Sequence, residues 1–121
     1  MKKTLYFLSM LFILFTACSK EKTEYIDNTP QLEVTVVDLS HTTVADATVT
    51  LYASEVDLKA KTNSLKSGTT NSEGIVLFSD LEENVYYFYA EKAEMNNTKS
   101  TSLISEKLQI NMKVTVQTTI K

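Results

Sequence analysis

The residues of this chain that could perform chemistry are few, and the only histidine is His41. Hydroxyl and carboxylate side chains lie near it in the sequence: Asp38, Ser40, Thr42 and Asp46. Such a set could form a catalytic triad, in which the imidazole accepts the proton of a serine nucleophile. No nucleophile-elbow or oxyanion motif accompanies it. We therefore favour a solvated turn histidine, and expect no catalytic residues and no enzymatic activity.

Metal ligands are equally sparse. One histidine and one cysteine are too few for a zinc site, which takes four nitrogen or sulfur ligands. An acidic stretch could collect Ca²⁺ through Asp80, Glu82, Glu83 and Asn84, but it lacks the spacing of an EF-hand. We favour a solubilising hairpin tip there, and expect no metal and no cofactor.

The charge of the chain bears on its partners. All twelve basic residues are lysine, and the formal net charge is −3, or −5 once Lys2 and Lys3 are removed with a leader. Binding to nucleic acid needs a basic surface, so no nucleic-acid partner is expected.

The first residues have the pattern of a secretory signal. Lys2 and Lys3 precede an apolar run from Leu5 to Ala17, which is 13 residues long. A helix of that length spans about 20 Å, whereas the hydrocarbon core of a bilayer is about 30 Å thick. A basic start, a short apolar core and small residues before a cut site are typical of a cleaved leader.

The end of the run, Phe15-Thr16-Ala17-Cys18, resembles the lipobox of bacterial lipoproteins, although Phe15 stands where leucine is usual. The resemblance implies removal of residues 1–17 and lipidation of Cys18, which would anchor the chain to the membrane. The alternatives are an ordinary signal peptide with a chance cysteine and an uncleaved anchor. Residues 18–30 are then expected to be the lipidated cysteine and a flexible tether. Within it, Ser19 to Glu24 resembles a surface-export signal, and a solvated charged tether is the equal alternative.

From Gln31 to Lys121 the apolar residues alternate with polar ones, as in half-buried strands. The residues expected to face inward are Leu32, Val34, Val36, Ala47, Val49, Leu51, Ala53, Val76, Phe78, Tyr86, Phe88, Ala90, Leu108, Ile110, Met112, Val114 and Val116. Further strands are expected near Leu65 to Thr70 and near Ser100 to Ser105. The stretch from Glu55 to Ser67 is either a loop or a single helical turn. The fold class is thus all-β: one immunoglobulin-like sandwich of about seven strands, residues 31–121, after an N-terminal signal helix.

Three polar clusters separate these runs. Asn71-Ser72-Glu73-Gly74 predicts a hairpin turn in which Gly74 takes positive φ. Residues 80–84 and 96–99 predict two more turns.

The stretch from Leu32 to Ala90 resembles transthyretin-like sandwiches, namely carboxypeptidase regulatory-like domains and the B-type repeats of collagen adhesins. The resemblance lies in four stretches: Leu32-Glu-Val-Thr-Val-Val-Asp38, Val44-Ala-Asp-Ala-Thr-Val-Thr-Leu-Tyr52, Thr69-Thr-Asn-Ser-Glu-Gly-Ile-Val-Leu-Phe78 and Leu81-Glu-Glu-Asn-Val-Tyr-Tyr-Phe-Tyr-Ala90. Asn71 replaces the usual aspartate, and Asn84 stands where glycine is usual. The resemblance implies a spacer, stalk or binding module rather than an enzyme.

Two activities known among such domains do not suit these residues. An internal Lys–Asn isopeptide bond needs a lysine on the first strand, and residues 32–37 contain none. Hydroxyisourate hydrolases rely on several histidines and an arginine, which this chain lacks.

The remaining feature is a set of aromatic and aliphatic side chains. If Val76, Phe78, Tyr86 and Phe88 face the core, then Ile75, Leu77, Tyr87 and Tyr89 face outward, and pairing of neighbouring strands would bring these four together as a binding patch. The alternative is that the chain from Met95 onward covers them.

Together these features predict a lipid-anchored protein of the bacterial envelope, placed in the outer membrane and either surface-exposed or periplasmic. Its sandwich is expected to be a non-catalytic binding or structural module, adhesin-like, for an unknown protein or glycan partner. The alternative is an accessory subunit of an outer-membrane assembly or transport complex.

Overall fold

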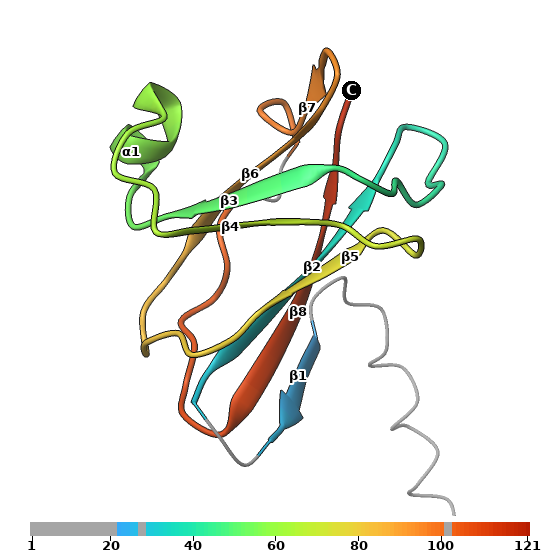
Figure 1. The fold of residues 1–121 in the computed structure, drawn as a ribbon. Coiled ribbons are helices and arrows are strands. Elements are labelled where there is room, and N and C mark those ends of the chain that lie inside the picture. The colour runs from blue at the N-terminus through green and yellow to red at the C-terminus, as the bar shows by residue number, and fades with distance from the viewer. Residues whose placement is uncertain (1–21, 27–28, 101–102) are drawn as a thin grey trace, which may run out of the picture.

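The computed structural model describes residues 22–26, 29–100 and 103–121. They form two four-stranded sheets packed face to face, so the prediction of a small β-sandwich is confirmed (Figure 1). The predicted signal helix and Cys18 lie outside the described residues.

The first sheet has the order β1-β8-β2-β5. Its strands are β1 (Lys22–Tyr25), β2 (Gln31–Val37), β5 (Ile75–Phe78) and β8 (Met112–Thr119). The strands β2 and β8 run parallel, from the pair Gln31 and Lys113 to the pair Val37 and Thr119, whereas the other pairs of this sheet are antiparallel. A strand near the start of the domain therefore closes against its last strand.

The second sheet has the order β4-β3-β6-β7 and is antiparallel throughout. Its strands are β3 (Thr48–Tyr52), β4 (Lys66–Thr69), β6 (Tyr87–Lys92) and β7 (Met95–Asn96). The predicted strand near Leu65 to Thr70 is confirmed as β4. The six-residue helix α1 (Glu55–Ala60) joins β3 to β4, so the helical alternative for this stretch is the right one.

Alternation along the strands places the core between the sheets, as predicted. Leu32, Val34 and Val36 of β2 are fully buried, as are Val49 and Leu51 of β3 and Phe88 of β6. Two inward assignments are wrong, because Ala53 and Ile110 are exposed. β8 begins only at Met112, and the preceding turn, with Met112 N–H bonded to the Gln109 carbonyl, turns Ile110 outward.

Two boundaries also differ from the prediction. Lys22–Tyr25 was expected to belong to the tether, but it is β1 and pairs with β8. Of the strand expected near Ser100 to Ser105, the structure describes residue 100 and residues 103–105, and these are not in a strand. Residues 103–105 do follow the edge of β6, through hydrogen bonds between Phe88 N–H and the Leu103 carbonyl and between Ser105 N–H and the Tyr86 carbonyl, but they make only an isolated bridge at Ile104.

The hairpin turn before β5 has the predicted conformation. Gly74 has a φ of +77°, and Asn71 Oδ1 accepts hydrogen bonds from the N–H groups of Glu73 and Ile75. An asparagine here provides the same acceptor as the aspartate of the transthyretin-like pattern. In the later loop the left-handed residue is Asp80, with a φ of 55°.

Candidate functional site

The predicted patch of four outward side chains is not formed. Ile75 and Leu77 lie on β5 in the first sheet, whereas Tyr87 and Tyr89 lie on β6 in the second. The loop from β5 to β6 crosses between the layers instead of closing a hairpin, so the outward faces of these strands point in opposite directions. Leu77 is exposed, and Ile75 is half-buried.

The two tyrosines are covered to different degrees. Tyr89 is buried with Tyr52 and Leu58, and Tyr87 packs against this cluster half-buried. The cover comes mainly from α1 and not, as the alternative had it, from the chain after Met95. The later part also contributes: Ile104 bridges to Tyr87, and Ser100 and Leu103 line the same hollow as Tyr87 and Leu58.

The helix α1 is held over Tyr89 from both of its ends. Ser54 begins it, with its hydroxyl accepting from the Asp57 N–H at 3.1 Å. Such a cap satisfies one of the free N–H groups of the first turn. Lys61 ends it in a left-handed conformation, and its Nζ lies 4.3 Å from the centre of the Tyr89 ring. A cation at that distance is attracted to the ring face.

The environment of Tyr89 changes its acidity. Burial raises the pKa of the Tyr89 phenol above its ordinary value of 10.0, and the negative charge of Glu91 raises it further. Above pH 10 the native state therefore holds this proton while the unfolded chain loses it, so stability falls as pH rises. Below pH 10 both states are protonated, and the group contributes no pH dependence.

We expect the Tyr89→Phe variant to lose less stability than the parent chain between pH 10 and pH 11. The reason is that the variant has no phenol to ionise in the unfolded state. Urea unfolding at each pH checks this result, with Tyr25→Phe as the matched removal of one exposed phenol. An identical alkaline loss in Tyr89→Phe and in the parent chain would contradict the assignment.

The structure places His41 in an exposed turn after β2, with a φ of 66°. Asp38 Oδ1 accepts from the N–H groups of Ser40 and Thr42, at 2.9 and 3.0 Å. That carboxylate therefore organises the turn. An exposed turn histidine is what the sequence predicts.

The acidic side chains of the β5–β6 loop are bonded in separate directions. Thr29 Oγ1 donates to Asp80 at 3.1 Å, Asn84 Nδ2 donates to Glu82 at 3.3 Å, and the Ile110 N–H donates to Glu83 at 2.9 Å. Among the described residues, no group of three histidine, cysteine, aspartate or glutamate side chains could hold a metal ion.

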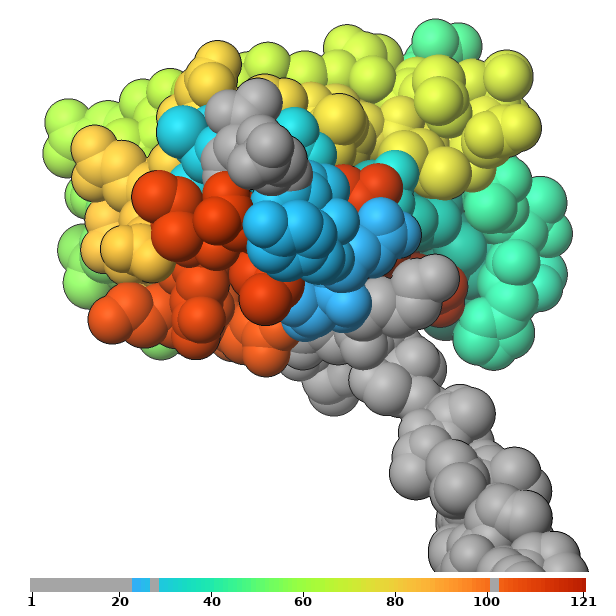
Figure 2. Space-filling model, turned by 90° about the horizontal axis from the view of Figure 1, so that it is seen from below, coloured from blue at the N-terminus to red at the C-terminus, as the bar shows by residue number. Residues whose placement is uncertain are grey.

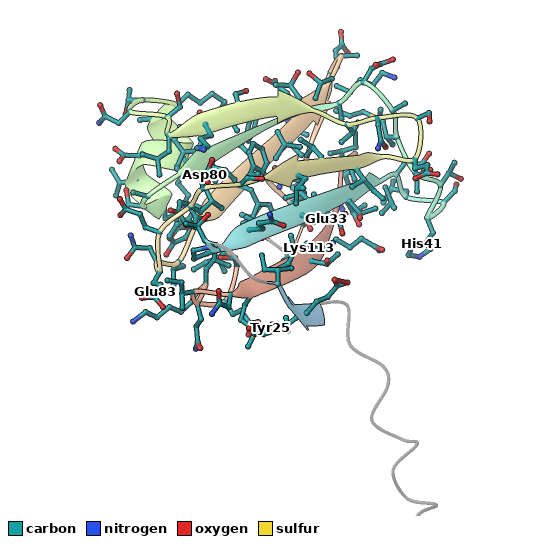
Figure 3. All side chains as sticks on the ribbon, turned by 60° about the horizontal axis from the view of Figure 1, so that its bottom comes forward. Tyr25, Glu33, His41, Asp80, Glu83 and Lys113 are labelled. Carbon is teal, nitrogen blue, oxygen red and sulfur yellow. The ribbon has the colours of Figure 1, made fainter. Side chains whose placement is uncertain are left out.

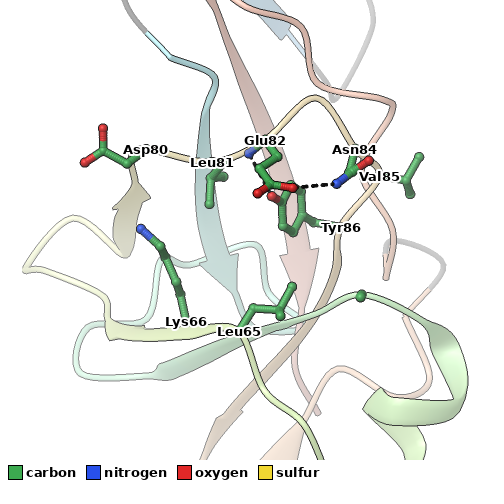
Figure 4. Close-up of a pocket in the computed structure, with 9 residues that line it drawn as sticks. Leu65, Lys66, Asp80, Leu81, Glu82, Asn84, Val85 and Tyr86 are labelled. Carbon is green, nitrogen blue, oxygen red and sulfur yellow. Dashed lines mark hydrogen bonds between the residues drawn. The ribbon is translucent and has the colours of Figure 1, made fainter.

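A cavity of about 620 Å³ lies between this loop and the start of β4 (Figure 4). Its lining combines apolar and polar side chains: Ala53, Leu65, Lys66, Asp80, Leu81, Glu82, Asn84, Val85 and Tyr86. Lys66 Nζ donates to the Ser79 carbonyl at 2.8 Å, and the Tyr86 hydroxyl accepts from the Glu82 N–H at 2.9 Å. Both bonds fix the walls of the cavity.

The chemistry of this lining suits binding. It combines aliphatic and aromatic side chains with a few polar groups, as small-molecule sites do. The described residues that line it include no serine, threonine, cysteine or histidine. Sequence analysis missed this cavity, because residues 80–84 were interpreted as a solvated tip and Leu65 was not linked to them.

Comparison with known proteins defines the fold and little more. No family model matches the chain, and no curated protein matches it. Among solved structures the chain is similar to the Bacillus anthracis TIE protein, with a TM-score of 0.51 and 19% sequence identity. The likeness shows the fold. The match covers 78% of this chain but only 16% of the TIE protein, so it corresponds to a small part of a longer bacterial protein.

One further observation concerns the membrane. Within residues 22–26, 29–100 and 103–121, no helix is long and apolar enough to cross a bilayer.

Proposed function

We propose that this protein is an envelope lipoprotein, anchored through a lipid on Cys18, that holds a non-catalytic β-sandwich as a binding or structural module. The observation that carries the proposal is the apolar run ending at Cys18 together with a folded strand beginning at Lys22.

Lipidation would supply the membrane attachment. Each CH₂ group of an acyl chain that enters the bilayer adds about 0.8 kcal/mol to the free energy of membrane binding. Two or three acyl chains therefore hold a small domain firmly on a bilayer. The sandwich itself then needs no spanning helix.

The finer family assignment is also a proposal. A transthyretin-like sandwich is supported by the Asn71 turn and by Thr70, whose buried hydroxyl donates to the Val44 carbonyl at 2.7 Å and accepts from the Ala47 N–H at 2.9 Å. These bonds join the two stretches that resemble that family. Such domains serve as spacers and binding modules.

The partner we propose is an envelope protein, a host protein or a glycan. The cavity lined by Leu65, Leu81 and Tyr86 is the surface that we propose receives one of its groups. We place the protein in the outer membrane, with the domain on the cell surface. Protease treatment of intact cells tests the orientation, since a surface domain is removed and a periplasmic one is protected.

The anchor is tested by metabolic labelling with a fatty acid. We expect the parent chain and Ser19→Ala, the matched control, to take up label, and Cys18→Ser to take up none, because only the thiol accepts the diacylglycerol. Label in Cys18→Ser, or none in the parent chain, would exclude the lipid anchor.

A further inference from the structure

The connection between the proposed anchor and the folded domain is short. Only residues 19–21 separate Cys18 from Lys22, the first residue of β1. A fully extended chain advances at most about 3.6 Å per residue, so the Cα of Lys22 lies within about 14 Å of the Cα of Cys18. If Cys18 carries acyl chains, Lys22 must stay within about that distance of the lipidated residue, and Tyr25, three residues further on, within about 25 Å of it.

Pairing of β1 prevents this connection from becoming longer. All four of its residues pair with β8, from Lys22 with Thr115 to Tyr25 with Met112. Beyond the strand, the Ile26 N–H donates to the Asn111 carbonyl at 2.7 Å. The Thr23 hydroxyl donates to Glu106 at 2.8 Å. The domain could move further from Cys18 only if these hydrogen bonds broke.

Two large apolar side chains are exposed at the other end of β1, three residues on from Lys22. Tyr25 is 70% exposed and Ile110 is 56% exposed. Ile110 stands two residues before Met112, the register partner of Tyr25. In the view from below, β1 and the segment leading into β8 form adjoining parts of one face (Figure 2). Tyr25 points away from the body of the domain at that face (Figure 3).

The chemistry of this end suits the region of lipid headgroups. A tyrosine has an apolar ring and a polar tip, and tyrosines are enriched where hydrocarbon meets water. The neighbouring carboxylates already have partners: Glu24 lies 3.7 Å from Lys113, Glu106 accepts from Thr23, and Glu83 accepts from the Ile110 N–H. Approach to lipid would therefore leave none of these three carboxylates without a partner.

Other exposed apolar side chains lie elsewhere: Leu39, 66% exposed, follows the end of β2 that is opposite Tyr25. Leu77 lies on β5, at the opposite edge of the same sheet, and Val56 lies on α1 beside the second sheet. Neither is adjacent to the strand where the connection to Cys18 begins.

From these observations we infer that the β1 end of the sandwich, through Tyr25 and Ile110, is a second membrane contact that rests on the bilayer holding the anchor. The inference depends on the proposed function, because the acyl chains provide the proximity. The contact would fix the orientation of the domain, so that a partner approaches a defined face.

Single tryptophans test this contact, since the chain has none. The lipidated full chain is reconstituted in phosphatidylcholine vesicles whose acyl chains carry bromine near the headgroup. We expect bromine to lower the tryptophan emission of Tyr25→Trp, and separately of Ile110→Trp, roughly two-fold, because these positions lie at the interface. Leu77→Trp is the matched control, at an exposed apolar position on the far edge, and its emission is expected to stay unchanged.

The possible failures are distinguishable. If the lipidated protein does not float with the vesicles, both the anchor and the contact are wrong. If it floats but positions 25 and 110 are no more quenched than position 77, the anchor stands and the contact is excluded. The Cys18→Ser form of Tyr25→Trp is expected to lose the quenching, and persistent quenching without acyl chains would contradict the dependence on the anchor.

Discussion

Replacing Asn97 with alanine is expected to lower the free energy of unfolding by about 2–4 kcal/mol, which for a domain of this size lowers the thermal midpoint by roughly 10–30 °C. Asn97 is fully buried, and its side-chain amide makes three hydrogen bonds. Its Oδ1 accepts from the Ala90 N–H at 2.9 Å, and its Nδ2 donates to the Phe88 carbonyl and to Thr118 Oγ1, both at 3.1 Å.

These bonds explain the size of the expected effect. The strand β7 has only two residues, so the edge of β6 beyond it would present unpaired backbone groups to the interior. The Asn97 amide takes the place of a neighbouring strand there. Its bond to Thr118 also joins the second sheet to β8 of the first. Removal of the amide leaves buried polar groups without partners, which costs more than a hydrogen bond contributes.

A matched control shows whether the loss of stability comes from the burial of Asn97 or from the removal of any asparagine side chain. The Asn84 side chain is exposed and bonds only to Glu82 in the described structure. We expect Asn84→Ala to lower stability by less than about 0.5 kcal/mol. Calorimetry of both variants checks the pair, and equal midpoints would contradict the role assigned to Asn97.

The second large effect is expected for Gly74→Ala, which should lower stability by roughly 3 kcal/mol, from about 1 for the left-handed backbone and about 2 for steric overlap. The φ of Gly74 is +77°, a conformation that side chains disfavour. An added Cβ would also lie 2.8 Å from Thr43 Cβ and 3.0 Å from both the Val36 carbonyl oxygen and the Val44 nitrogen. Two of these three atoms belong to the backbone and have little freedom to move.

Asn71→Asp is the matched control in the same turn. It retains the oxygen that accepts from Glu73 and Ile75, and it adds no bulk. We expect its stability to stay within about 0.5 kcal/mol of the parent chain. Urea unfolding of both variants is the measurement, and a stable Gly74→Ala variant would show that the turn before β5 is built differently.

Local sequence signals predicted much of the sandwich. Alternation identified the inward faces of β2 and β3, and Asn71 with Gly74 identified the turn before β5. These features depend on residues close together in the chain, where periodicity and turn chemistry decide the conformation.

The errors came from long-range pairing. The sequence of β1, Lys-Thr-Glu-Tyr, is polar like a tether, and it becomes a strand because β8, about 90 residues later, offers it a free edge. Ile75 and Tyr89 were expected side by side because their strands are consecutive, yet the loop between them changes sheets. No local pattern specifies which sheet a strand joins.

The cover over Tyr89 was missed for a related reason. The sequence predicts either a loop or a single helical turn for residues 55–67, and neither alternative says which face of a sheet its apolar side chains would cover. In the structure Leu58 is the buried residue of α1, and its side chain packs on Tyr52 and Tyr89 at the outer face of the second sheet. The parallel pairing of β2 with β8 could not be predicted from either segment alone, because the two strands lie near opposite ends of the domain sequence.

The lipid anchor is the claim on which the function and the membrane contact both depend. Intact mass spectrometry of the protein purified from bacterial membranes tests it most directly. Our account predicts a mature chain that starts at Cys18 and carries a diacylglycerol thioether with a further acyl group on its amino terminus. An unmodified thiol at position 18, or a chain that still begins at Met1, would contradict it.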